Sequence, residues 1–158
     1  TGLQLNAMGD MVLRVDGRRI DPAQCMAYKG VMLSGVPNFV YTFGYTNASW
    51  TLKADLTARW TCRLLNHLAR NGQAVAVAPR DPTVAEAPFL SLSSGYVQRA
   101  RDLLPRQGTQ GPWQVNQNYL ADLRVLRWGA LDDGTLCFAR AGQPLPSTST
   151  EGRVTAVG

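Results

Sequence analysis

One segment of the chain, residues 39–53, combines polar residues and a change of pattern that are typical of ligand-binding sites. Residues 39–43 are β-branched or aromatic and predict a strand buried on both faces. The turn that follows contains two residue types favoured at helix N-caps, Asn47 and Ser49. Free backbone N–H groups and the positive end of the helix dipole project outward at such a junction, so it could bind a negatively charged group such as phosphate. The alternative is that Asn47 and Ser49 only cap a core helix.

Other positions carry weaker chemical signals. His67 lies near the end of the helical pattern without a Ser, Cys or Asp partner at a suitable spacing, so we expect a surface position or an interaction with the helix dipole. Lys53 could approach a ligand at the turn or be an ordinary solvated lysine. Trp50 could line a cavity, although packing in the core is favoured. Asp132 and Asp133 precede a glycine and predict a turn, not a pair of catalytic carboxylates.

Composition excludes several classes of function. Cys25, Cys62 and Cys137 form no CxxC pair and, with a single histidine, offer no zinc-ligand set, so we expect no metal site and free, buried thiols. The net charge of +5 comes from 14 Arg and 2 Lys spread along the chain, without the clustering expected of a nucleic-acid-binding protein. No apolar run reaches the roughly eighteen residues of a membrane span. These features leave a globular protein that binds no nucleic acid and has no transmembrane segment.

Apolar residues that recur every four positions predict a long amphipathic helix over residues 49–70, which would place the turn at its N-terminus. The predicted core stripe of this helix, with two residues beside it, is Leu52, Leu56, Trp60, Leu64 and Leu68, with Cys62 and Leu65. Asp16-Gly17 predicts a β-hairpin within the first twenty residues. The remaining predicted elements are a strand at 74–78, a short helix within 96–104, a helix over 112–126 and a hairpin-like turn at 131–135.

Longer motifs carry a resemblance to a known family. Residues 28–38 (YKGVMLSGVPN) lead into residues 44–56 (GYTNASWTLKADL), and together they resemble the C-terminal FAD-contacting segment of class B flavin-containing monooxygenases. Within that class they are similar to the Baeyer–Villiger type that includes the ethionamide-activating monooxygenases. The likeness spans residues 1 to about 140, and its further motifs are residues 62–66, 88–90, 94–99, 104–108, 112–113, 118–120 and 132–134.

The resemblance implies an α/β fold: the C-terminal portion of a two-dinucleotide-binding-domain flavoprotein, with a buried strand leading into a long helix. Residues 1–140 would be the C-terminal part of the FAD-binding domain and its extension. Residues 141–158, rich in Gly, Pro, Ser and Thr, predict a disordered tail. Asn47, Thr51 and Leu52 are the expected FAD contacts, with the backbone N–H groups of Thr51 and Leu52 directed at the flavin's pyrimidine edge.

The resemblance also implies a reaction for the intact protein. It would use FAD, NADPH and O2 to insert one oxygen atom into ketones, or to oxidise sulfides or thioamides, through a C4a-peroxyflavin. No GxGxxG motif is present, so FAD and NADPH would be bound mainly by an N-terminal part, and we expect no catalytic residue in this chain. We also expect that the intact protein can form a homo-oligomer and that it is cytoplasmic, with a peripheral position at the membrane as the alternative. The alternative is a non-catalytic fragment or a docking module of a split flavoprotein.

Overall fold

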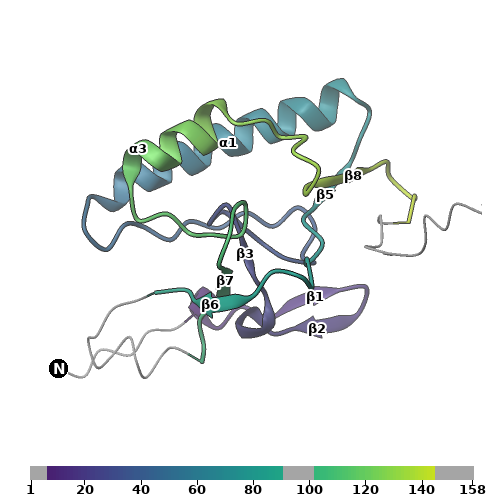
Figure 1. The fold of residues 1–158 in the computed structure, drawn as a ribbon. Helices are drawn as coiled ribbons and strands as arrows, with labels where there is room; N and C mark the ends of the chain where they lie inside the picture. Colours follow the sequence, from purple (N-terminus) through teal and green to yellow (C-terminus); the bar gives the residue numbers. More distant parts are fainter. Residues whose placement is uncertain (1–6, 91–101, 145–158) are drawn as a thin grey trace, which may run out of the picture.

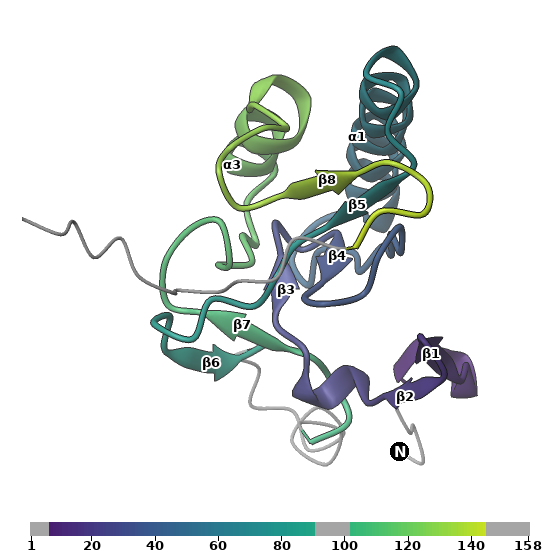
Figure 2. The same ribbon diagram turned by 90° about the vertical axis from the view of Figure 1, so that its right-hand side faces the viewer.

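The computed structural model describes residues 7–90 and 102–144, and one long helix organises them. Helix α1 (Trp50–Arg70) has 21 residues, which confirms the helix predicted over residues 49–70. A short helical segment lies alongside it in both views (Figures 1 and 2), formed by α3 (Tyr119–Asp122) and its continuation η3 (Leu123–Trp128). The strands lie below both helical segments in the view of Figure 1.

The buried face of α1 differs from the predicted stripe at its N-terminal end. Leu56, Trp60, Leu64 and Leu68 are buried as predicted, but Leu52 is 39% exposed and Lys53 is only 2% exposed. The reason is geometric: a step of four residues rotates about 40° beyond a full turn, so a line of such steps winds around the helix. Lys53 precedes Trp60 by seven residues, a spacing that returns to nearly the same face. The two residues predicted beside the stripe, Cys62 and Leu65, are also exposed.

The described strands form four two-stranded antiparallel sheets. The pairs are β1 (Leu13–Val15) with β2 (Arg18–Ile20), β3 (Ala27–Tyr28) with β4 (Met32–Leu33), β5 (Val75–Val77) with β8 (Cys137–Ala139), and β6 (Glu86–Pro88) with β7 (Arg106–Gly108). Two short 3-10 turns precede β1 and β3, at η1 (Ala7–Asp10) and η2 (Pro22–Gln24). The mixture of helix and strand agrees with the α/β class only in this coarse sense, because no parallel sheet occurs within residues 7–90 and 102–144.

The predicted hairpin and the strand at 74–78 are confirmed. Asp16 and Gly17 adopt the left-handed backbone conformation (φ 49° and 78°) that a tight hairpin turn requires. Strand β5 lies inside the predicted range, and its partner β8 follows the predicted turn at 131–135. That turn does not close a hairpin, however, because β8 pairs with the distant β5.

The buried strand predicted at residues 39–43 is wrong. Within this segment only Val40 forms a β-bridge, with Met32, and Thr42 is exposed. Its apolar side chains pack against different groups of core residues: Val40 against the main core, Phe39 against Leu33 and Val36, and Phe43 against Phe89. The apolar residues of this segment therefore serve contacts with three separate core clusters, not burial inside one sheet.

The main core lies between α1, α3–η3 and the strands. Its buried members are Met26, Tyr28, Val31, Met32, Leu56, Trp60, Leu64, Leu68, Ala76, Ala78, Val84, Trp113, Leu126, Leu131 and Leu136. The helix predicted over residues 112–126 begins later, at Tyr119, because the Asn118 side chain caps it by accepting hydrogen bonds from the N–H groups of Leu120 and Ala121. The predicted helix within 96–104 and the predicted tail fall largely outside the described residues. No helix in the described part of the chain is long and apolar enough to span a membrane.

Candidate cofactor-binding turn

The predicted contact residues Asn47, Thr51 and Leu52 lie together on one exposed turn at the start of α1. Ser49, not Asn47, occupies the N-cap position, and its hydroxyl lies 2.7 Å from the Thr51 hydroxyl without capping a backbone N–H. The Leu52 N–H donates to the Ser49 carbonyl at 3.3 Å. The Thr51 N–H lies in the first helical turn, where α-helical geometry provides no acceptor. The turn therefore presents a donor in the positive field of a 21-residue helix.

Aromatic and aliphatic side chains flank this donor. Trp50 is 57% exposed, so the prediction that it packs in the core is wrong. Its indole contacts Phe43, with ring centroids 5.4 Å apart, and also covers the backbone of Gly44. A Cβ atom on Gly44 would lie only 2.2 Å from the indole ring, so this close approach requires glycine. Together with Leu52, the indole gives the turn an apolar surface next to its hydrogen-bond donor.

A buried ion pair lies beneath the turn. The Lys53 ammonium is 2.7 Å from Oδ2 of Asp122, and the two side chains are 3% and 2% exposed. The Tyr45 hydroxyl donates to the same oxygen at 2.7 Å. Burial lowers the pKa of Lys53, against the opposing effect of Asp122, while burial and the bond to Asp122 raise the pKa of Tyr45. Lys53 is thus not the solvated lysine that the sequence allowed.

The sequence analysis missed Asp122 and Tyr45, although one signal was available. Lys53 stands three and seven residues before Leu56 and Trp60, on the face that those two residues bury. A lysine at such a position must find a buried anion, because an unpaired buried charge is very costly. A second contact ties down the same turn, since the backbone N–H and the hydroxyl of Thr46 both donate to Oε1 of Gln117, at 2.9 and 3.1 Å.

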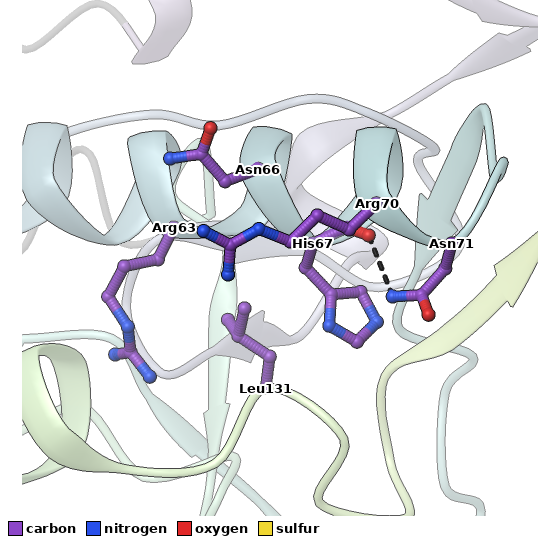
Figure 3. Close-up of a pocket in the computed structure, with 6 residues that line it drawn as sticks. All are labelled: Arg63, Asn66, His67, Arg70, Asn71 and Leu131. Carbon is purple, nitrogen blue, oxygen red and sulfur yellow. Dashed lines mark hydrogen bonds between the residues drawn. The ribbon is translucent and has the colours of Figure 1, made fainter.

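The opposite end of α1 carries a different hollow, of about 520 Å³ (Figure 3). Its lining residues are Arg63, Asn66, His67, Arg70, Asn71 and Leu131. Arg63 is already engaged there, because its guanidinium donates to the carbonyls of Leu126 and Gly129 at 2.6 and 2.7 Å. The centroids of the His67 and Phe138 rings are 4.5 Å apart. His67 is in the last turn of the helix, the position from which an interaction with the helix dipole was predicted.

The remaining candidates have structural positions. Asp133 belongs to a turn, as predicted, but it also accepts a hydrogen bond from Tyr28 at 2.8 Å and pairs with Lys29 at 2.7 Å. All three cysteines are free; Cys25 is buried and Cys137 half-buried, whereas Cys62 is exposed, contrary to prediction. No cluster of His, Cys, Asp or Glu that could hold a metal ion occurs in the described ranges.

The start of α1 thus combines a backbone donor with an exposed apolar rim formed by Trp50 and Leu52. Sequence comparison finds relatives: over about nine tenths of its length the chain is similar to proteins named FAD-containing monooxygenases. It is 50% identical over 146 residues to FAD-containing monooxygenase EthA of Mycobacterium tuberculosis. It is 46% identical over 146 residues to the putative FAD-containing monooxygenase MymA of the same species, and 43% identical over 145 residues to the probable FAD-binding monooxygenase AlmA of an Acinetobacter species.

These matches cover 92%, 90% and 90% of this chain, but only 30%, 29% and 29% of the relatives. The chain therefore spans about 30% of the length of the proteins that it matches. No family model and no solved structure matches it. The resemblance to part of a flavin-containing monooxygenase, predicted from the motifs at residues 28–38 and 44–56, is confirmed.

Proposed function

We propose that this chain is the C-terminal portion of an FAD- and NADPH-dependent monooxygenase of the Baeyer–Villiger type, built on two dinucleotide-binding domains. The intact protein transfers one oxygen atom from O2 to a small ketone, sulfide or thioamide. The observation that carries the proposal is the 50% identity to FAD-containing monooxygenase EthA over 92% of the chain. The redox and oxygen chemistry is supplied by FAD when it is bound.

The role of this chain is to form one wall of the flavin site. The Thr51 N–H would donate to the pyrimidine edge of the flavin, where negative charge is favoured by the positive end of the α1 dipole. Asn47 and Leu52 would contact the ring system from the same turn, and the Trp50 indole would exclude water beside it. The proposal is supported by the exposure of these four side chains at the start of α1, next to the buried Tyr45, whose hydroxyl donates to Asp122.

Two substitutions of Thr51 in the full-length protein test this role. Thr51→Val removes the hydroxyl but keeps the N–H, whereas Thr51→Pro removes both, at a position in the first helical turn where proline is tolerated. We expect Thr51→Val to reduce FAD by NADPH at the parent rate. Thr51→Pro should lose about 1.5–3 kcal/mol, the range for a hydrogen bond to a charged group, and the loss should appear as slower flavin reduction or weaker FAD binding.

His67→Ala is the matched control at the other end of the same helix. It lies 16 residues further along, which corresponds to about 24 Å at the rise of an α-helix. Its turnover should equal that of the parent. If Thr51→Pro behaves like the parent while His67→Ala abolishes oxygen transfer, the flavin wall is not at the start of α1 and the hollow in Figure 3 becomes the better candidate.

A further inference from the structure

The two ends of the exposed turn meet at a single atom. Tyr45, where the turn begins, and Lys53, in the first turn of α1, both donate to Oδ2 of Asp122, each at 2.7 Å. The residues between them, 46–52, are all exposed. Asp122 comes from α3, separated from Lys53 by 69 positions in the chain. One carboxylate oxygen on a separate element therefore closes the loop that carries the predicted cofactor contacts.

Stability alone does not require this arrangement. A buried ion pair pays a large desolvation cost, and apolar residues of similar size are often as stable or more stable in its place. The pair is also enclosed tightly, because the Lys53 ammonium lies 5.8 Å from the centre of the Tyr45 ring and 3.5 Å from where a Cβ on Gly30 would be. What apolar side chains cannot provide is directional bonds that fix both ends of an exposed loop in one register.

We propose that Asp122, Lys53 and Tyr45 are positioning residues, which hold the turn of residues 46–52 in the conformation that meets the flavin. This inference rests on the proposed function. The three residues act through the loop, since all are buried and none belongs to its exposed face. Gln117 supports the same role from the segment before α3, by accepting both hydrogen bonds from Thr46.

The decisive variant in the full-length protein is the double substitution Lys53→Met with Asp122→Leu. It removes one positive and one negative charge, so the net charge around the flavin is unchanged and any shift in flavin potential reports geometry. We expect a folded protein whose FAD dissociation constant rises about tenfold or more, the loss typical of charge-assisted hydrogen bonds. The absorption spectrum and midpoint potential of the bound flavin should also change.

Tyr45→Phe is a milder test that removes only the shared hydroxyl, and we expect about a fivefold weaker affinity for FAD. Tyr41→Phe is its matched control, because the Tyr41 hydroxyl is also buried but has no hydrogen-bond partner within residues 7–90 and 102–144. That control should match the parent in affinity, spectrum and potential. If the double variant fails to fold, the comparison of these two phenylalanine variants decides the question.

The outcomes separate the two proposals. A parent protein that binds no FAD overturns the proposed function and this inference with it. A parent that binds FAD, together with a double variant of unchanged affinity, spectrum and potential, overturns only the positioning role. The same applies if Tyr45→Phe and Tyr41→Phe are indistinguishable in all three measurements.

Discussion

Gly44 and Trp50 offer a sharp test of the geometry of the turn. A methyl group on Gly44 would lie 2.2 Å from two atoms of the Trp50 indole and 2.8 Å from a third. Carbon atoms in contact are normally about 3.5–4.0 Å apart, so Gly44→Ala must displace the ring by more than an ångström. Because Trp50 is 57% exposed, the ring is able to swing toward solvent, at the cost of its contact with Phe43.

The expected cost combines the lost aromatic contact with the lost burial of part of the indole, on the order of 1–2 kcal/mol. The double-mutant cycle isolates this term. In a Trp50→Ala background the space above Gly44 is empty, so Gly44→Ala should cost less than about 0.5 kcal/mol there. The four proteins are compared by equilibrium unfolding in urea and by their FAD dissociation constants. Gly44→Ala should raise the dissociation constant only when Trp50 is present. An equal cost in both backgrounds would refute the argument, since the effect would then come from the backbone and not from the indole.

Two further predictions concern residues outside the turn. Burial raises the pKa of Asp133, but hydrogen bonds, including those from Lys29 and Tyr28, outweigh it and hold the pKa below the ordinary value of 3.8. The stabilisation is therefore complete above that value and is lost as pH falls through the lower pKa of the folded state. Urea unfolding of Asp133→Asn should therefore show a smaller loss of stability in acid than the parent shows. Arg63→Met should destabilise the protein by about 2–3 kcal/mol in thermal or urea unfolding, because two main-chain carbonyls lose a charged donor. The control Arg70→Met, at an exposed position on the same helix, should change the stability by less than about 0.5 kcal/mol. Equal effects of the two substitutions would exclude this role of Arg63.

Elements with a strong local pattern were predictable from the sequence. Helix α1 has 21 residues and a sustained apolar period, and its bounds differ from the prediction by a single residue at the N-terminus. The hairpin β1–β2 follows from Asp16-Gly17, since few dipeptides accept two consecutive positive φ angles. Both features are decided by residues near one another in the chain, which is why a single sequence was enough.

Features that depend on distant partners were not predictable in this way. Tyr28 and Asp133 are 105 positions apart, and Lys53 and Asp122 are 69 apart. Nothing in the local sequence around Asp133 distinguishes an ordinary turn aspartate from one that holds a buried tyrosine. The segment 39–43 failed for a related reason, because strand formation needs a neighbouring strand and this segment finds only a single bridge, at Met32.

The start of α1 inverts the usual distribution of residue types, and this inversion argues for a covered surface. Lys53 and Asp122 are enclosed, while Trp50 and Leu52 on the adjacent turn are 57% and 39% exposed. For a surface that always faces water, an exposed lysine and a buried tryptophan would be the arrangement of lower free energy. The observed arrangement is favoured only when an apolar surface covers the tryptophan and when the loop beneath it has to keep one conformation. The chain spans about 30% of the length of the FAD-containing monooxygenases that it matches, so a further part of such a protein is the covering surface that the proposed function implies.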